Sequence, residues 1–343
     1  MARLRRSDCA GPGISRRRRG RGFSYTTDDG RPVTDEETLE RIRTLAIPPA
    51  WTDVWICPWP NGHIQAVGTD AAGRRQYRYH DQWRTERDRE KFDRMLDFAQ
   101  VLPKLRKRVR RDLKADGLGR TRVLAAMVRL LDTGLFRVGG EEYAEEHETF
   151  GVASLRKEHV RVRDGVMIFK YPAKGSIERC AEVRDAQVRG VVTALQRRRS
   201  GGPNLFAYRQ GRRWVEVHAQ HVNDYIKEVA GADFSAKDFR TWWGTVLAAA
   251  ALAEHDPGSE SGAGHRRAVR EAVAVVADHL GNTPAVSRSS YVDPRVVERF
   301  ADGQTIEAGS SRRLSLPDGQ VAQGEAPSRP TEEAVIELLD PEV

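Results

Sequence analysis

The sequence predicts an α+β protein of two domains: a small N-terminal α+β domain with an antiparallel sheet, and a larger, mainly α-helical domain with a small three-stranded sheet. Three observations support this prediction. The chain has 343 residues, too many for one average domain and about right for two. Strand-like runs separated by turn residues occur in residues 23–100. Amphipathic helical segments dominate residues 101–304, where only one short stretch alternates apolar with polar residues.

The two ends differ from the rest of the chain in composition. Residues 1–22 contain the runs RLRR and SRRRRGRG, and residues 305–343 are acidic and rich in Ser, Pro and Gly. Both ends have too little apolar surface to offset the entropy lost on ordering. We therefore expect a disordered basic arm at 1–22, an N-terminal domain at 23–100, a second domain at 101–304 and a disordered tail at 305–343.

The N-terminal domain should contain two helices with three strands between them. Thr34, with Glu37 three residues later, forms a capping box that begins the first helix. The strand-like runs WTDVWICP, HIQAVGTD and RRQYRYH follow, the first two separated by a turn at Asn61. Residues 81–100 then have a helical pattern.

The second domain should begin with the basic helix LPKLRKRVRRDLK. The helix RTRVLAAMVRLLDT follows it and ends at Gly134. The stretch LRKEHVRVRDGVMIFKYPAKGSIERCAEV alternates in polarity and has turns at Asp164 and Lys174, which predicts a three-stranded meander. The remaining chain has a mainly helical pattern up to a last helix that begins at Pro294.

The charge favours a polyanionic partner. Charged residues make up 31% of the chain and the net charge is +8, a balance that favours nucleic acid over a basic protein without such a partner. Three cysteines without CxxC spacing argue against a disulfide framework and a zinc site, and fit a reducing cytosol. No apolar run approaches the roughly 18–20 residues of a membrane span, and no secretory signal is present. We expect a cytoplasmic protein without a membrane segment.

The sequence lacks the common nucleotide, cofactor and metal motifs. It has no GxxxxGK[ST], no GxGxxG after a strand, no HExxH and no EF-hand loop. The acidic run EEYAEEHE at 141–148 is best explained as a solvated helix face, with metal binding as the alternative. We expect no metal and no cofactor, which leaves chemistry performed by side chains alone.

Tyr291 lies in the polar stretch GNTPAVSRSSYVDPRVV, between two helical segments. A phenol is a weak nucleophile at neutral pH because its pKa is about 10. Transfer of a phosphodiester to a phenol needs cations, which arginine forks supply when no metal does. Arg137, Arg240 and Lys174 are candidates for this role, although any one of them alone is a weak signal and is more typical of a surface residue.

Taken in order, five segments resemble the type IB DNA topoisomerases of the small bacterial and poxvirus-like kind. They are RIRTLAIPPAWTDVWICPWPNGHIQAVGTDAAGRRQYRYHDQWR, VLAAMVRLLDTGLFRVGGEEYAEEHETFGVASLRKEHV, FKYPAKGS, KDFRTWWGT and GNTPAVSRSSYVDPRVV. They cover residues from about 35 to 300. The resemblance implies the fold of DNA breaking-rejoining enzymes and relaxation of supercoiled duplex DNA without ATP or metal. It also implies a nucleoid-associated monomer that holds double-stranded DNA between two lobes.

The resemblance implies a role for each candidate residue. Tyr291 attacks the scissile phosphodiester and forms a 3′-phosphotyrosyl bond, Arg137 and Arg240 bind the non-bridging oxygens, Lys174 donates a proton to the departing 5′ oxygen, and Asn282 hydrogen-bonds a phosphate oxygen. Poxvirus and eukaryotic members have His where Asn282 stands, and an amide carries no positive charge. His279 is expected in the last turn of a helix, away from the phosphate.

Further residues are candidates for DNA contacts. The strand RRQYRYH and the run RKEHVRVR supply them: Gln76, Tyr77, Arg78, Tyr79, Arg156 and Lys157. The alternatives are that one strand face packs against the core and that the basic run is a solvated face. Two other functions stay open. A tyrosine recombinase uses a similar residue set but generally has an additional helical domain, and a non-catalytic DNA-binding protein would carry the same charge.

Overall fold

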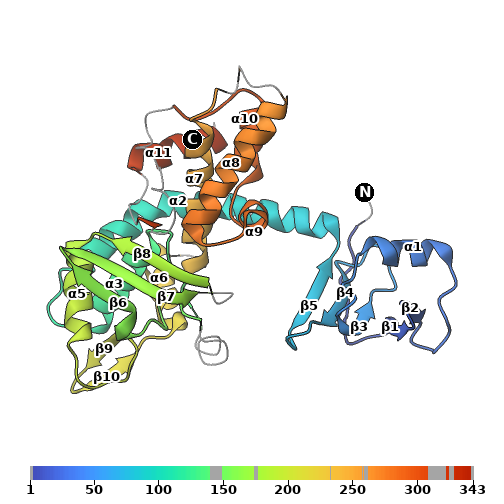
Figure 1. The fold of residues 1–343 in the computed structure, drawn as a ribbon, viewed down its shortest axis with the longest axis horizontal. Helices are drawn as coiled ribbons and strands as arrows, with labels where there is room; N and C mark the ends of the chain where they lie inside the picture. Colours follow the sequence, from blue (N-terminus) through green and yellow to red (C-terminus); the bar gives the residue numbers. More distant parts are fainter. Residues whose placement is uncertain are drawn as a thin grey trace. The chain divides into compact units, whose positions relative to one another are not determined.

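The computed structural model describes residues 3–139, 149–173, 177–231, 233–256, 258, 262–307, 322–323 and 328–340. The chain divides into two compact units, Met1–Asp93 and Arg94–Val343. The N-terminal unit holds a five-stranded sheet, and the C-terminal unit holds most of the helices and a smaller sheet (Figure 1). The fold is therefore of the predicted α+β class.

The N-terminal unit is an antiparallel sheet covered by one helix. Its elements are β1 (Ile14–Arg19), β2 (Gly22–Thr26), α1 (Glu36–Thr44), β3 (Thr52–Ile56), β4 (Ile64–Thr69) and β5 (Arg75–Tyr79), and the strand order is β2-β1-β3-β4-β5. Strands β3, β4 and β5 confirm the three predicted runs. The core of this unit consists of residues from β1, α1, β3 and β4, which are Ile14, Ile42, Val54, Ile56 and Ala66.

The prediction of a disordered basic arm is wrong, because residues 14–19 form β1. This strand pairs with β2 on one side and β3 on the other. Ile14 is buried in the core, and the guanidinium of Arg16 donates to three backbone carbonyls between Ile47 and Trp51. One apolar residue and the sheet hydrogen bonds thus order a run whose composition is almost entirely basic.

Two helix boundaries also differ from the prediction. The N-cap of α1 is Asp35 rather than Thr34, and its carboxylate accepts from the backbone N–H of Thr38 at 2.8 Å.

The two helices predicted around residue 100 are one helix, α2 (Asp81–Asp112), which contains Pro103. Proline removes one hydrogen bond from a helix, but here the helix continues through it. The units therefore separate within α2, before the predicted boundary at residue 100.

The C-terminal unit combines helices with a small sheet. Its further elements are α3 (Arg120–Leu131), η1 (Lys157–His159), β6 (Val160–Arg163), β7 (Val166–Ala173), β8 (Ile177–Val183), α5 (Ala186–Gln196), β9 (Ala207–Gln210), β10 (Arg213–Glu216), α6 (Ala219–Ala230), α7 (Ala236–Leu252), α8 (Gly262–Leu280), α9 (Pro284–Ser290), α10 (Pro294–Ala301), β11 (Ala322–Gln323) and α11 (Arg329–Leu339). Strands β6, β7 and β8 form the predicted meander, and β11 adds a parallel fourth strand beside β8. The hairpin of β9 and β10 lies in a stretch predicted to be mainly helical.

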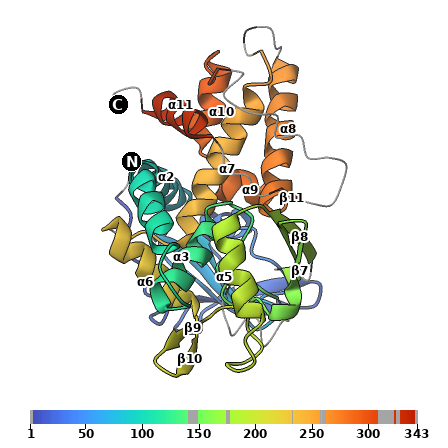
Figure 2. The same cartoon turned by 90° about the vertical axis from the view of Figure 1, so that its left-hand side faces the viewer.

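Helix α7 is the central element of this unit. Almost every residue of α7 is buried, including the charged residues Asp238 and Arg240. It contacts α3, α6, α8, α10 and α11, and Figure 2 shows α8 and α11 beside it. Trp242 and Trp243 are its largest side chains, and the indole of Trp243 donates to the carbonyl of Asp132 at 2.9 Å.

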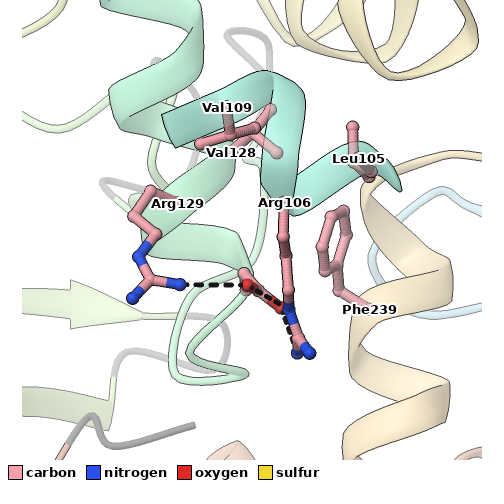
Figure 3. Close-up of a pocket in the computed structure, with 7 residues that line it drawn as sticks. Leu105, Arg106, Val109, Val128, Arg129 and Phe239 are labelled. Carbon is pink, nitrogen blue, oxygen red and sulfur yellow. Dashed lines mark hydrogen bonds and ion pairs between the residues drawn. The ribbon is translucent and has the colours of Figure 1, made fainter. Parts of the chain in front are cut away.

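The prediction of a disordered tail is wrong for residues 329–339, which form α11. Glu332 of this helix is buried and accepts hydrogen bonds from Arg106 of α2 and from the indole of Trp242. Arg106 also pairs with Asp132, which accepts a further bond from Arg129 (Figure 3). The acidic composition of the tail does not predict this contact, because Arg106 and Trp242 lie on helices distant in sequence.

The first prediction tests how α11 is held. Glu332→Ala should lower the free energy of unfolding by about 2–3 kcal/mol, because Arg106 and Trp242 lose a buried charged acceptor. Glu333→Ala, at the next position, removes only an exposed pair with Arg329 and should change it by less than about 0.5 kcal/mol. Urea unfolding of the full chain measures both values, and equal small effects would contradict this account.

Candidate active site

Arg137 and Arg240 lie together at the carboxyl end of α8. Arg137 donates to the carbonyl of Gly281 at 3.0 Å, and Arg240 donates to the carbonyl of Leu280 at 2.6 Å. The last carbonyls of a helix have no partner within the helix, and its negative dipole end stabilises cations. Arg240 also donates to the carbonyl of Gly134 at 3.1 Å. Backbone carbonyls, which do not neutralise the charge, thus hold both guanidinium groups in place.

Tyr291 directly follows α9, a short helix in the stretch predicted as a loop, and α7 holds it. The guanidinium carbon of Arg240 lies 5.3 Å from the centre of the Tyr291 ring. The hydroxyl of Thr245 donates to the Tyr291 carbonyl at 3.2 Å. Gly244 leaves room for the tyrosine, since a Cβ there would lie 2.5 Å from the same carbonyl oxygen. Residues 240 and 244 are one turn apart, which explains the spacing in RTWWG.

The charges around Tyr291 favour its phenolate. Burial raises the pKa of the phenol, but the positive charges of Arg240, Arg137 and Lys237 outweigh burial and hold that pKa below its usual value of 10. Burial, together with the neighbouring charge of Arg137, lowers the pKa of the Arg240 guanidinium. The site therefore gains stability when a negative charge forms at or beside the phenol oxygen.

Asn282 and His279 lie near the same helix end in different settings. The Oδ1 of Asn282 accepts from Arg137, and its buried Nδ2 has no partner among the described residues. His279 is in the last turn of α8, as expected, where its ring stacks on Trp243 with 5.1 Å between ring centres. Its Nε2 bonds the carbonyl of Thr133 at 3.1 Å. Lys174 lies outside the described residues.

A third arginine at this helix end was not predicted. Arg179 of β8 donates to the carbonyl of Asp278 at 2.9 Å and also to that of His279. It lines one small pocket together with Arg137 and Arg240. Nothing in the sequence marks Arg179, because a basic residue in an alternating strand is typical of an exposed face.

The four predicted contacts of β5 divide between the two sheet faces. Tyr77 and Tyr79 point outward, with 43% and 40% of their surface exposed, and their ring centres are 6.0 Å apart. Gln76 and Arg78 point to the opposite face, where Gln76 donates to Asp70 and Arg78 donates to a backbone carbonyl. Of the four predicted contacts, the two tyrosines are therefore the ones whose side chains lie exposed on the outer face.

The strand register places further basic residues on the same face as the tyrosines. Cross-strand partners run from Tyr77 through Val67 and Trp55 to Ser15. Side chains alternate along a strand, so Arg17 and Arg19 of β1 share the face of Ser15. Both are exposed.

The two predicted contacts before β6 differ in exposure. Arg156 is exposed, with its guanidinium carbon 5.3 Å from the centre of the Phe150 ring. The ammonium of Lys157 donates to the carbonyl of Arg198 at 3.1 Å. Arg156 is therefore better placed than Lys157 to bind an external phosphate.

The described residues contain neither a candidate metal-ion cluster nor a candidate membrane span. No group of three or more His, Cys, Asp or Glu side chains there is arranged to hold a metal ion. The acidic run at 141–148 lies outside the described ranges. Across the described part of the chain, no helix is both long enough and apolar enough to cross a bilayer.

Two family models match the chain. Residues 80–311 match the catalytic core of eukaryotic DNA topoisomerase I, and residues 22–70 match the N-terminal domain of bacterial DNA topoisomerase IB. The chain belongs to the type IB DNA topoisomerase family. The first match contains the helices and the sheet that position Arg137, Arg240 and Tyr291.

Similar proteins include viral type IB topoisomerases. The DNA topoisomerase 1B of Acanthamoeba polyphaga mimivirus is 33% identical over 298 residues, covering 84% of this chain and 87% of the relative. The DNA topoisomerase I of Monkeypox virus is 21% identical over 295 residues, covering 81% and 87%. Among solved structures, the XerH site-specific recombinase is 14% identical over 59% of this chain and 52% of its own, with a TM-score of 0.36. The family assignment does not depend on this distant likeness.

The second prediction concerns the contact of α7 with Tyr291. Gly→Ala within a helix normally stabilises by about 0.5–1 kcal/mol. Gly244→Ala should instead displace Tyr291 and slow supercoil relaxation by about 100-fold, since a misplacement near 1 Å costs that much. Gly190→Ala in α5 is the control, because its Cβ meets nothing within 4 Å and relaxation should stay at the wild-type rate. A Gly244→Ala enzyme as active as wild type would show that this packing does not position the tyrosine.

The third prediction concerns pH. Burial, aided by the charges of Arg179 and Arg240, lowers the pKa of His279 from 6.5 to about 4. Between these values the unfolded chain binds a proton that the folded chain does not, so stability falls as pH decreases from about 6.5 to about 4. His279→Gln should reduce this loss, as measured by denaturant unfolding at several pH values. An unchanged pH dependence would show that His279 is not responsible.

Proposed function

We propose that this protein relaxes supercoiled duplex DNA by cutting and resealing one strand through a 3′-phosphotyrosyl bond to Tyr291, without ATP or metal. The observation that supports the proposal most strongly is the position of the Tyr291 ring beside Arg240, at a helix end where Arg137 and Asn282 are also fixed. Family membership gives the class of reaction, and this geometry supports the proposed role of each residue.

The proposed reaction exchanges one phosphate ester for another. The Tyr291 oxygen attacks phosphorus, its proton passes to solvent, and the bond from phosphorus to the 5′ oxygen breaks. Lys174 is the proposed donor of a proton to that departing oxygen. In resealing, the 5′ hydroxyl attacks the phosphotyrosine and the phenol leaves. Each step breaks one phosphate ester bond and forms another. The reaction therefore requires neither ATP nor an external nucleophile.

Arg137, Arg240 and Asn282 are proposed to bind the non-bridging oxygens as charge builds on them. A single fixed donor of this kind is worth roughly 2.7–4 kcal/mol of barrier, and several donors acting together are not additive. The carbonyl contacts of both arginines fix their forks before DNA arrives. Asn282 contributes as a neutral donor through Nδ2, the atom that has no partner among the described residues.

The proposed partner is double-stranded DNA, bound by a monomer in the cytoplasm at the nucleoid. The proposed DNA contacts are Gln76, Tyr77, Arg78, Tyr79, Arg156 and Lys157. The outward rings of Tyr77 and Tyr79 and the exposed guanidinium of Arg156 are the strongest of these candidates. Because most such contacts go to phosphates, binding should weaken steeply as salt rises.

The fourth prediction tests the proposed chemistry. With supercoiled plasmid, EDTA and no ATP, the wild-type protein should give a ladder of relaxed topoisomers and a covalent adduct when denatured during turnover. Tyr291→Phe should lose both while keeping its DNA affinity. Lys174→Ala should slow relaxation by about 10²–10⁴-fold, the usual contribution of a general acid. Tyr208→Phe, a buried tyrosine of β9, is the control and should relax normally.

Three outcomes would contradict the proposal. Relaxation by Tyr291→Phe at the wild-type rate would remove the assigned nucleophile. Strand exchange between two cognate sites without relaxation would identify a recombinase. Tight DNA binding with neither reaction would identify a non-catalytic DNA-binding protein.

A further inference from the structure

Arg179 has no role in the reaction described above. We propose that Arg179 is a third phosphate-binding cation of the active site, acting through its charge on the phosphate that Arg137 and Arg240 bind. This inference rests on the proposed function, because it names an additional residue for the same reaction.

The first support is the pocket that the three arginines share. Arg137, Arg179 and Arg240 line it, although they come from the segment after α3, from β8 and from α7. Each guanidinium donates to carbonyls at the end of α8. Among the described residues, no carboxylate pairs with any of the three. Three like charges therefore lie together with no counter-ion among the described residues, which favours an anion from outside.

The second support is a set of buried donors without partners. The Nε atoms of Arg179 and Arg240 and the Nδ2 atom of Asn282 are buried and lack a hydrogen-bond partner among the described residues. Leaving a buried donor without a partner destabilises the folded protein, so a group of such donors needs an explanation. A phosphate offers several acceptor oxygens and would satisfy donors of this kind.

The third support is that the Tyr171 hydroxyl in this pocket stays neutral. Tyr171 lines the same pocket, and burial raises the pKa of its phenol to about 12, although the three arginines act in the opposite direction. Burial, and then the charge of Arg137, lower the pKa of Arg179 itself. Among the described residues that line the pocket, none therefore carries a negative charge to offset the arginines.

Gly281 allows Arg179 to reach this position. Its φ is +61°, a conformation that favours glycine, and a Cβ there would lie 3.0 Å from Nη1 of Arg179. The carbonyl of the same glycine holds Arg137. Arg137 and Arg179 therefore lie against neighbouring parts of one helix end. Arg179 supplies positive charge near Asn282, whose side-chain amide is neutral.

The test compares a charged with a neutral scissile phosphate. Single-turnover cleavage is measured at a mapped site, on a duplex with the ordinary phosphodiester and on one with a methylphosphonate, which lacks the negative charge. Arg179→Ala should slow cleavage of the phosphodiester by about 10- to 100-fold, as expected for loss of one charged donor. On the methylphosphonate, wild type and Arg179→Ala should differ by less than about threefold, because the charge that Arg179 binds is gone. Arg179→Lys keeps the charge and should restore most of the phosphodiester rate.

Arg189→Ala is the matched control. Arg189 also donates to the carbonyl of a glycine with positive φ, Gly165, at the other end of β7, and a Cβ on that glycine would lie 2.7 Å from its Nη1. Losing it should leave cleavage of both substrates at the wild-type rate. Thermal unfolding of each variant shows whether it is folded, and an unfolded Arg179→Ala is replaced by Arg179→Gln.

Two results would overturn the inference. One is cleavage of the phosphodiester by Arg179→Ala at the wild-type rate. The other is an equal loss on both substrates, which would make Arg179 a structural support only. In either case, cleavage and formation of the covalent adduct by the wild-type protein would still support the proposed function. If the wild-type protein never cleaves, the proposed function itself is wrong.

Discussion

The active site depends on the carbonyl groups at the carboxyl end of α8. A helix end must find donors for its last carbonyls, and here arginines from three separate segments provide them. The same contacts that complete the helix also fix the forks of Arg137, Arg179 and Arg240 around one pocket. Backbone carbonyls orient these cations without neutralising them, as carboxylates would. A common requirement of folding thus gathers three guanidinium groups at the place where the proposed reaction needs to bind a phosphate.

Helix α7 positions the proposed nucleophile, Tyr291, at this site. Arg240, Gly244 and Thr245 lie within two turns of one another and contact the ring, the backbone and the carbonyl of Tyr291. The helix is buried on nearly all sides, so these contacts rest on a rigid element. The position of the tyrosine is therefore set by core packing, and the ionisation of its phenol is set by the neighbouring charges.

Local patterns predicted much of the fold, because strands and turns follow from alternation and from glycine or asparagine positions. The meander of β6 to β8 and the strands β3 to β5 were visible in this way. Composition was misleading at both ends: β1 is ordered by pairing with β3, and α11 by the burial of Glu332 against Arg106. Arg137, Arg240 and Tyr291 could be named from their order along the chain. Arg179 could not, because its place depends on a contact between residues about a hundred positions apart.

The most direct measurement of the central claim is a structure of the Tyr291→Phe protein bound to duplex DNA at a cleavage site. We predict that the scissile phosphate lies in the pocket of the three arginines, with its non-bridging oxygens within hydrogen-bond reach of Arg137 and Arg240. We also predict that both arginines keep their bonds to the α8 carbonyls. A scissile phosphate held elsewhere, or arginines that leave the helix end to bind it, would contradict the claim that the helix end preorganises this site.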